Sequence, residues 1–506
     1  MLSRTISGFL SVAAIATLLG IPRAADAVGQ PDCAALQVLG VPNTTITSAS
    51  LVPASGAFPE YCNVTGHVDT EIGFALHLPT QWNGKFLFQG LGGLDGLIPG
   101  PGAGLMRGYA EIGTNTGHVS ADGSLYDGSW AFNRPDRQVN WAYRSTHVVA
   151  IAGTEITNAY YGRPPEHSYY SGCSGGGRHA TMSATLYPTD FDGVVAGSPF
   201  LSPTGQVIAW NWDEQALAHT AIPPAKLPLI THAVVAACDA KDKVIDGLLS
   251  DPRRCDFNTS TLQCPAGVNN SSCLTPGEIT TLNKMYGGPY NSTGVQLFPG
   301  WEPGVEYPLW LMALVNSVNG GPGELLVRIP DQFLTYFIFG PGFDPYSFNF
   351  DRDPAALTAA AQLFDVKPEL SAFANAGGKI LMYHGWADPR LATLYSIGFH
   401  EAVQTNLQRD HHGKPIDIDD FYRLFLVPGM GHCSGGPGPY SVDWLSALEK
   451  WVEQGIAPDR LIGSHLTNGV VDLTRPLCPY PQEAVYTGRG SIFDAASFEC
   501  RVRQVN

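Results

Sequence analysis

Short apolar runs alternate with longer amphipathic stretches along most of this chain. Helices are predicted over 141–161, which Gly162 follows, over 178–187, which Pro188 follows, and over 442–452, whose apolar residues share one helical face. Five runs rich in apolar and β-branched residues are predicted to be strands, over 74–78, 85–89, 192–198, 379–383 and 422–427. This alternation predicts an α/β fold.

The alternating pattern stops between residues 201 and 370. That segment contains four cysteines, an acidic loop and many aromatic residues, and strand–helix alternation resumes after it. We therefore predict a catalytic core made of 28–200 and 371–506, with a large lid domain inserted over 201–370. Residues 28 to about 66 carry turn signals and are predicted to be irregular.

Residues 1–27 have the pattern of a secretory signal peptide. Arg4 precedes an apolar stretch over 6–21, and Ala25-Asp26-Ala27 has the small-residue pattern of a cleavage site. We expect a secreted protein, extracellular or periplasmic, and an uncleaved anchor is the alternative. No later stretch approaches 18 unbroken apolar residues, so no membrane association is expected of the mature form.

The charge balance is acidic, with a formal net charge of −16 and 15% charged residues. Nucleic-acid binding calls for a basic surface, so the composition argues against a nucleic-acid partner. It suits a secreted enzyme that acts on a neutral or aromatic substrate.

Ten cysteines all follow the predicted cleavage site, and an even number in an exported chain predicts disulfides. The number alone does not define the connectivity. Proximity along the chain suggests four bridges, namely Cys33–Cys62, Cys238–Cys255, Cys264–Cys273 and Cys478–Cys500. Cys173 and Cys433, far apart in the sequence, are left over.

The stretch Gly172-Cys173-Ser174-Gly175-Gly176 fits G-x-S-x-G, the sharp turn that presents a nucleophilic serine in α/β-hydrolases. Strand-forming residues over 167–171 precede it, and the predicted helix over 178–187 follows. Ser174 is therefore the candidate nucleophile, and the amide of Gly175 is a candidate oxyanion donor. In a chain with 57 glycines, an ordinary glycine turn is the alternative.

An α/β-hydrolase places its acid and then its histidine after the nucleophile in the sequence. Asp388 follows the predicted strand over 379–383 and is the candidate acid, with a turn or helix-capping aspartate as the alternative. His432 follows the predicted strand over 422–427 and is the candidate base. If Cys173 pairs with Cys433, a bridge joins the neighbours of nucleophile and base; two free buried thiols are the alternative.

Other histidines compete for the role of base. His179 lies shortly after Ser174, on the predicted helix, and His411-His412 lie in a charged, solvated stretch. His384 precedes the candidate acid and is a candidate to line the pocket.

An acidic loop in the predicted lid has carboxylates at spacings that suit a cation. Asp239, Asp242 and Asp246 follow Cys238, and the carbonyls of Val244 and Leu248 would alternate with them. Hard oxygen ligands on a short loop suit Ca²⁺, although the terminal glutamate of an EF-hand is missing. The spacing of these carboxylates fits a solvated acidic turn and a metal-binding loop equally well.

The adjacent pairs Cys173-Ser174 and His432-Cys433, with Asp388 between them, resemble the CS-D-HC arrangement of the tannase/feruloyl esterase family. Further similar features cover nearly all of the mature chain, at 82–86, 90–96, 117–118 and 344–351. The resemblance implies an α/β-hydrolase core with a large inserted lid. It also implies Ser174 as nucleophile, His432 as general base and acid, Asp388 as the residue that orients it, and a Cys173–Cys433 bridge.

The same resemblance implies two further sites. The second oxyanion donor would come from the glycine loop, where Gly92 and Gly93 are both candidates. A structural Ca²⁺ would be bound in the lid, although Lys243 stands where a glycine is common in the family. The ligands it implies are Asp239, Asp242, Val244, Asp246 and Leu248.

The implied function is that of a secreted serine carboxylesterase. Its substrates would be aromatic esters of the hydroxycinnamoyl or feruloyl type, small or linked to polysaccharide, hydrolysed through an acyl-enzyme. Galloyl esters and terephthalate monoesters are alternative substrates, and an inactive polyphenol- or carbohydrate-binding protein is the alternative of another class. Arg328 could meet a substrate carboxylate, but solvation at the surface is the favoured role for it.

Overall fold

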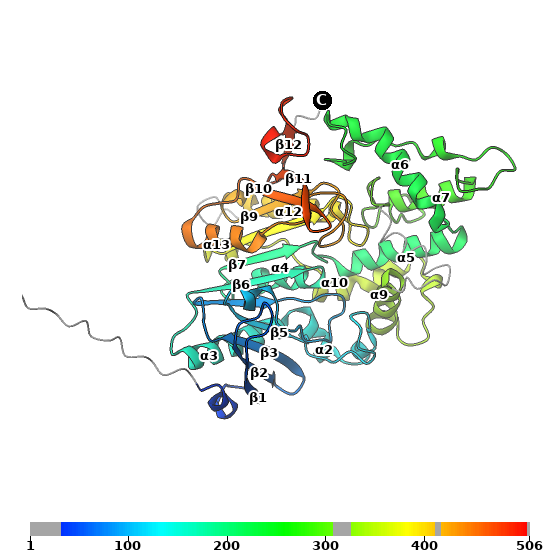
Figure 1. Ribbon diagram of the computed structural model, residues 1–506. Coiled ribbons are helices and arrows are strands. Elements are labelled where there is room, and N and C mark those ends of the chain that lie inside the picture. Colours follow the sequence, from blue (N-terminus) through cyan, green and yellow to red (C-terminus); the bar gives the residue numbers. More distant parts are fainter. Residues whose placement is uncertain (1–31, 307–324, 410–415, 503–506) are drawn as a thin grey trace, which may run out of the picture.

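The computed structural model describes residues 32–306, 325–409 and 416–502. The predicted signal peptide and the pair His411-His412 lie outside these residues. The chain folds around a nine-stranded sheet, with a group of helices to one side of it (Figure 1).

The strand order of this sheet is β1-β2-β3-β5-β4-β6-β7-β8-β9. Strands β4 to β9 are mutually parallel, and β1, β2 and β3 continue the sheet by antiparallel pairing. The strands are β1 (Thr44–Val52), β2 (Tyr61–Val68), β3 (Ile72–Pro79), β4 (Lys85–Gln89), β5 (Ala110–Thr114), β6 (His167–Cys173), β7 (Gly193–Gly197), β8 (Lys379–Gly385) and β9 (Tyr422–Val427). Because β6, β8 and β9 are parallel, the residues that follow their carboxyl ends lie along one edge of the sheet.

The predicted irregular structure before residue 67 is wrong, because β1 and β2 form a hairpin there. In β1 the register shifts between Ile46 and Ser48, so its buried residues Ile46 and Ala49 are three apart instead of two. This bulge hides the period-2 pattern by which a half-buried strand is recognised. In β2, Cys62, Val64 and Val68 do keep that period.

Helices cover both faces of the central sheet. In β8, Ile380 and Met382 pack with residues of α3, α4 and α12 on one face, whereas Leu381 packs with α13 on the other. The strand therefore has no solvent-facing side, as expected of a parallel strand between two layers of helices. These four helices are α3 (Ser145–Tyr161), α4 (Gly175–Leu186), α12 (Thr393–Arg409) and α13 (Trp444–Gln454).

The three helices predicted in the core are confirmed, with bounds that differ from the prediction by one to three residues. The first begins with a π-helical turn over Asn140–Arg144, continues as α3, and ends where Gly162 takes a left-handed conformation, φ 72°. Glycine adopts that conformation without the steric cost of a Cβ atom. Two short helices precede it, α1 (Ala103–Met106) and α2 (Pro135–Val139).

The segment between β7 and β8 contains the lid helices, which Figure 1 shows grouped beside the sheet. Their apolar cluster, with Trp210, Ile230 and Phe333, also includes Trp130 and Trp141 from the core. The lid thus shares one buried cluster with the core. Its helices are α5 (Pro203–His219), α6 (Leu227–Cys238), α7 (Pro276–Gly287), α9 (Leu325–Phe333) and α10 (Thr358–Phe364), and the short helix α11 (Ser371–Asn375) follows the lid just before β8.

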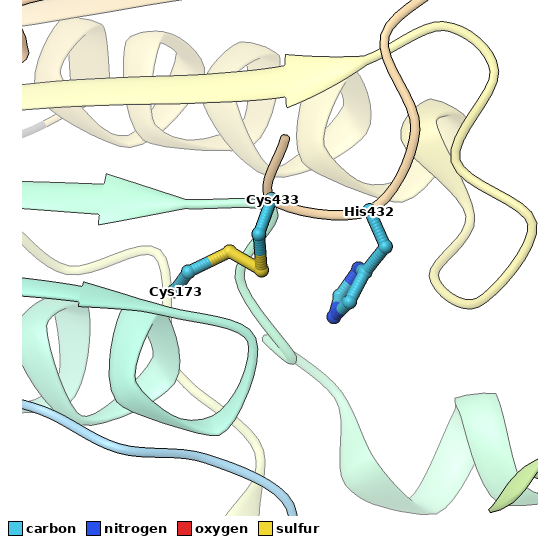
Figure 2. Close-up of side chains that lie close together, drawn as sticks. All are labelled: Cys173, His432 and Cys433. Atoms are coloured by element: carbon cyan, nitrogen blue, oxygen red, sulfur yellow. A yellow bond between two sulfur atoms is a disulfide. The ribbon is translucent and has the colours of Figure 1, made fainter. Parts of the chain in front are cut away.

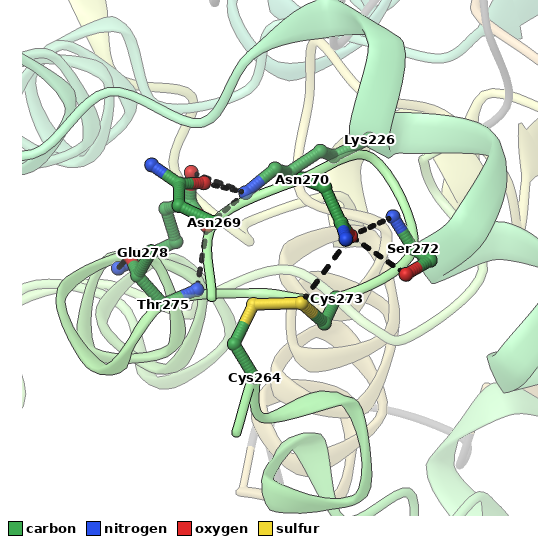
Figure 3. Close-up of a disulfide and its surroundings, with 8 residues drawn as sticks. All are labelled: Lys226, Cys264, Asn269, Asn270, Ser272, Cys273, Thr275 and Glu278. Carbon is green, nitrogen blue, oxygen red and sulfur yellow. Dashed lines mark hydrogen bonds and ion pairs between the residues drawn. A yellow bond between two sulfur atoms is a disulfide. The ribbon is translucent and has the colours of Figure 1, made fainter. Parts of the chain in front are cut away.

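A disulfide and a buried ion pair hold the middle of the lid together (Figure 3). Cys264 is bonded to Cys273 just before α7, and Thr275 caps that helix with Glu278 in a capping box. Glu278 also pairs with Lys226 at 2.7 Å, and both side chains are buried. Losing either partner would leave a charge uncompensated, so the pair constrains how α7 meets the segment before α6.

The C-terminal part adds two small antiparallel sheets. One is made of β10 (Leu461–Thr467) and β11 (Val470–Leu477), the other of β12 (Gln482–Tyr486) and β13 (Phe498–Val502).

Among the described residues no cysteine is free, and the bridges are the pairs expected above: Cys33–Cys62, Cys173–Cys433, Cys238–Cys255, Cys264–Cys273 and Cys478–Cys500.

Within the described ranges, no single helix has the length and hydropathy of a membrane span. The pair over Pro203–His219 and Pro224–Asp242, bent by 102°, meets that test only jointly.

Candidate active site

Ser174 stands at a strained turn between β6 and α4, with φ 62° and ψ −123°. Such a backbone is costly for a residue with a Cβ atom, and it holds the hydroxyl clear of both elements. The glycines around it permit close packing. A Cβ atom on Gly176 would lie 2.6 Å from the carbonyl oxygen of Leu91, and one on Gly172 would lie 2.8 Å from the backbone of Gly176. The motif therefore forms the predicted strand–turn–helix.

The loops after β8 and β9 bring Asp388 and His432 together. Asp388 Oδ2 lies 2.8 Å from His432 Nδ1, and Asp388 Oδ1 accepts hydrogen bonds from the amides of Arg390 and Leu391 at 2.9 and 3.1 Å. The two loops can approach because Gly385 has no side chain: a Cβ atom there would collide with the carbonyl oxygen of Met430. The carboxylate is thus anchored by backbone on one oxygen and faces the imidazole with the other.

A second imidazole contacts the same carboxylate oxygen. His384 Nε2 lies 3.1 Å from Asp388 Oδ2 and 3.2 Å from the carbonyl oxygen of Leu391, while its Nδ1 lies 2.8 Å from Ser396 Oγ. Both neighbours of Nε2 are acceptors, which assigns the proton to Nε2 and makes Nδ1 the acceptor for the Ser396 hydroxyl. His384 is fully buried beside Asp388, so it holds the acid and does not line the pocket as expected.

The electrostatics keep Asp388 ionised. Burial by itself would raise the pKa of Asp388, but the charge of His432 and the hydrogen bonds from His384 and His432 outweigh it. The net effect holds the pKa of this carboxyl well below its usual range. Asp388 is therefore a permanent acceptor at neutral pH, which sets His432 Nδ1 as a donor.

Ser174 and His432 line the same cavity, which has a volume of about 250 Å³. The glycine loop forms one wall, and Tyr126, Phe200 and Trp210 contribute aromatic rings. A side chain from the lid helix α9, Ile329, also lines it. The cavity is thus enclosed by core and lid together, and its wall is mainly apolar.

The bridge between Cys173 and Cys433 links the two sides of this site (Figure 2). It joins the last residue of β6 to the residue after His432, across 260 positions, with Cα atoms 5.9 Å apart. Closing so long a loop stabilises the fold by about 2–5 kcal/mol. An imidazole nitrogen of His432 lies within 4.8 Å of both sulfur atoms. Because these sulfurs are bonded to each other, they are not thiolate ligands, and the cluster is not a metal site.

The glycine loop packs directly against the turn at Ser174. A Cβ atom on Gly92 would lie 3.5 Å from both the Ser174 Cβ atom and the Gly175 amide nitrogen. Gly176 donates its amide to Leu91, and Leu94 donates to Leu125, which hold the loop in place. In the described chain no hydrogen bond occupies the amides of Gly92, Gly93 or Gly175, so they can serve a bound ligand.

The competing histidine His179 does not line the cavity. His179 is buried on α4, with Nε2 2.9 Å from the carbonyl oxygen of Trp141, and burial together with Arg178 holds its pKa well below the usual range. Its environment is that of a core histidine. Arg328, considered for substrate binding, forms an ion pair with Asp122.

The acidic loop of the lid has the donor types that calcium requires. Asp239, Asp242 and Asp246 are buried or half-buried, and burial raises the pKa of Asp239, with the charges of Asp246 and Asp242 adding to it. Each carboxylate accepts amides of its own loop, and Asp246 pairs with Arg475 at 2.5 Å, a contact that the sequence did not indicate. Lys243 has a left-handed backbone, φ 74°, and an exposed side chain. The positive charges of Lys243 and Arg475 thus lie near the carboxylates. The oxygen donors of the loop still fit a divalent cation.

The profile of the family described as tannase and feruloyl esterase matches residues 58–501. The chain belongs to this family. An uncharacterized esterase of Xanthomonas campestris is 35% identical over 97% of this chain and 94% of that protein. A mono(2-hydroxyethyl) terephthalate hydrolase of Piscinibacter sakaiensis is 31% identical, covering 90% of this chain and 87% of that protein.

Among solved structures, feruloyl esterase B of Aspergillus oryzae has a TM-score of 0.82 at 27% identity. The match covers 93% of this chain and 99% of that chain. The fold of the family is therefore the fold of this chain, an α/β-hydrolase core with a large insertion. These relatives are esterases, and this member of the family is a carboxylic ester hydrolase.

Proposed function

We propose that this protein is a secreted serine esterase that hydrolyses aromatic esters of the feruloyl type. One observation carries the mechanism: Ser174 and His432 open onto one cavity, while Asp388 accepts from His432 Nδ1. This is the relation of nucleophile, base and orienting acid that acyl transfer requires. The five disulfides support an oxidising compartment.

In the first half of the reaction, His432 Nε2 takes the proton of Ser174, whose oxygen attacks the ester carbonyl. The amides of Gly175 and of the Gly92–Gly93 segment stabilise the oxyanion. His432 then protonates the leaving alcohol, so the acyl group remains on Ser174. In the second half His432 activates a water molecule, and collapse of the second tetrahedral intermediate returns the proton to Ser174.

The walls of the cavity favour a hydroxycinnamoyl over a galloyl group. Phe200, Trp210 and Leu391 give apolar surface for a ring and its vinyl spacer. A gallate ring would place three hydroxyls against such surface, and each buried hydroxyl without a partner costs free energy. We expect kcat/KM for methyl ferulate to exceed that for methyl gallate by roughly tenfold or more. Steady-state rates on the two esters, with p-nitrophenyl butyrate as an unselective reference, test this; preference for methyl gallate would assign a tannase instead.

We further propose that the lid loop binds one structural Ca²⁺ through Asp239, Asp242, Asp246 and the carbonyls of Val244 and Leu248. Three carboxylates on one short loop repel each other, and a bound divalent cation would offset this in the folded state only. Adding calcium at about 100 times its Kd should then stabilise the fold by about 2.7 kcal/mol.

The melting temperature tests this, measured after EDTA treatment and again after calcium is restored. Asp242→Asn should abolish the calcium response. Asp251→Asn is the matched control, because Asp251 is a buried acid of the same region that pairs with Arg253. If the melting curves are the same in the presence and in the absence of calcium, the proposed calcium site is contradicted.

A further inference from the structure

Asp95 lies at the end of the glycine loop, buried and in a left-handed backbone conformation. Its side chain is 1% exposed, and its φ is 47°. A residue with a Cβ atom has a steric cost in this conformation that glycine avoids. A buried carboxyl group is also costly unless it has polar partners. Since glycine would fit this turn with less strain, the side chain of Asp95 calls for a role.

The backbone of Asp95 closes the turn that carries two candidate oxyanion donors. Its amide donates to the carbonyl of Gly92 at 3.0 Å, so Gly92, Gly93 and Leu94 lie within one turn. The turn is tightly packed, because Leu94 donates to the carbonyl of Leu125 at 2.8 Å and a Cβ atom on Gly93 would lie 2.3 Å from the same oxygen. A displacement of Asp95 is therefore passed on to the amides of Gly92 and Gly93.

The carboxyl group of Asp95 is linked to the helix that follows Ser174. Asp95 Oδ1 accepts from the indole nitrogen of Trp141 at 3.3 Å. The guanidinium of Arg178 lies over that indole, 4.1 Å from the ring centroid, and donates to the carbonyl of Trp141 at 2.9 Å. Arg178 lies one helical turn after Ser174 on α4, and its amide donates to the carbonyl of Ser174 at 3.0 Å. A chain of buried contacts thus connects the glycine loop to the nucleophile turn through Trp141 and Arg178.

Two acidic groups behind the glycine loop, Asp95 and Tyr170, are mainly neutral at pH 7. Burial raises the pKa of Asp95 to about 8, although the charge of Arg178 and the hydrogen bond from Trp141 oppose this. Burial also raises the pKa of Tyr170 well above its usual range, and a Cβ atom on Gly90 would lie 2.2 Å from the Tyr170 hydroxyl. Neutral groups suit this place, because a negative charge behind the donors would oppose an oxyanion.

We propose that Asp95 is a positioning residue that holds the amides of Gly92 and Gly93 in the orientation that an oxyanion in the cavity requires. It acts through its hydrogen bond with Trp141, and it is not among the described residues that line the cavity. The inference rests on the proposed function, because it assumes that an oxyanion forms when Ser174 attacks the ester. It predicts that the side chain of Asp95 affects the transition state and leaves substrate binding almost unchanged.

The test compares methyl ferulate with its thionoester, O-methyl thionoferulate, in which sulfur replaces the carbonyl oxygen. Sulfur is a weak hydrogen-bond acceptor, so the thionoester gains less from the oxyanion donors. Each kcat/KM is divided by the rate constant for hydroxide hydrolysis of the same ester, which removes intrinsic reactivity. The oxygen preference, defined as the normalised value for methyl ferulate divided by that for the thionoester, measures how well the oxyanion donors are placed.

Replacing Asp95 by alanine should lower kcat for methyl ferulate about 10- to 100-fold, the range expected when a catalytic group is displaced by about 1 Å. KM should change by less than about twofold, and the oxygen preference should fall by about threefold or more, because the lost interaction belongs to the transition state. Asp95→Gly should give the same result. Glycine has no strain at a φ of 47°, so this variant tests the proposal even if the alanine variant does not fold.

Two further variants separate positioning from a general effect on the fold. Asp95→Asn keeps an acceptor for the indole of Trp141 and tolerates the left-handed backbone, so kcat and the oxygen preference should return to within about threefold of wild type. Asp69→Ala is the matched control, because Asp69 also has a left-handed backbone, φ 51°, and pairs with Arg144 at 2.6 Å, outside the cavity lining. It should leave both quantities at their wild-type values.

The proposal is overturned if the alanine and glycine variants both keep the wild-type kcat, or if kcat falls while the oxygen preference stays the same. It is also overturned if Asp95→Asn is as slow as Asp95→Ala, since the contact with Trp141 would then not explain the effect. The wild-type enzyme separates the two levels. If it hydrolyses methyl ferulate and the variants behave like it, only the role of Asp95 fails; if it hydrolyses no aromatic ester, the proposed function fails.

Discussion

Replacing Ser174 by alanine should lower kcat for aromatic esters by about 10⁶-fold, the loss seen when a triad nucleophile is removed. Among the described side chains that line the cavity, Ser174 supplies the only hydroxyl apart from Tyr126, whose pKa is raised by partial burial so that its phenol stays neutral. Without it no acyl-enzyme forms, and only the oxyanion amides and binding remain to assist water. The measurement is the steady-state rate on methyl ferulate together with the pre-steady-state burst of p-nitrophenol from p-nitrophenyl butyrate, which should disappear.

The fold of this variant should be unchanged, since alanine at a φ of 62° suffers the same strain as serine. Equal melting temperatures of variant and wild type check this. Ser171→Ala is the matched control: it makes the same chemical change on the same strand, three residues earlier and outside the cavity lining. Its rates should stay within about twofold of wild type. Turnover by Ser174→Ala at the wild-type rate would falsify the serine mechanism.

Replacing Asp388 by asparagine should lower kcat by about 10⁴-fold. The asparagine oxygen can still accept from the amides of Arg390 and Leu391, so its NH₂ group takes the place of Oδ2 and faces His432 Nδ1. A donor at that position requires Nδ1 to become the acceptor, which moves the proton of a neutral imidazole to Nε2. His432 then presents a donor to Ser174 and cannot take its proton. His384, which donates to the same oxygen, adds a second mismatch.

The pH–rate profile and NMR of the imidazole nitrogens distinguish this tautomer effect from general damage. Asp365→Asn is the matched control, because Asp365 is a half-buried acid that accepts from Ser202 and Thr204 and lies outside the cavity lining. It should lower the melting temperature with little effect on kcat. A small loss of kcat in Asp388→Asn, comparable to that of Asp365→Asn, would remove Asp388 from the proposed triad.

The structure also shows why some local sequence patterns were sufficient to predict residues of the candidate site. The nucleophile turn at Ser174 depends on neighbours within a few residues: strand formers before it, glycines around it and a helix after it. Asp388 and His432 were found because each follows an apolar strand directly, and strand ends of a parallel sheet meet at one edge. The bulged strand β1 was missed because its period was broken locally.

The chain by itself therefore determined the α/β alternation, the order of the proposed nucleophile, acid and base, and the four bridges between cysteines that are near neighbours in the sequence. These features follow from periodicity and spacing, which are properties of short stretches. Only the tertiary structure decided that His384 supports Asp388, that His179 is a core residue and that Gly92 packs against Ser174. Each of these depends on how the chain packs around the ends of β4, β6 and β8, and no local pattern encodes which side chains then face one another.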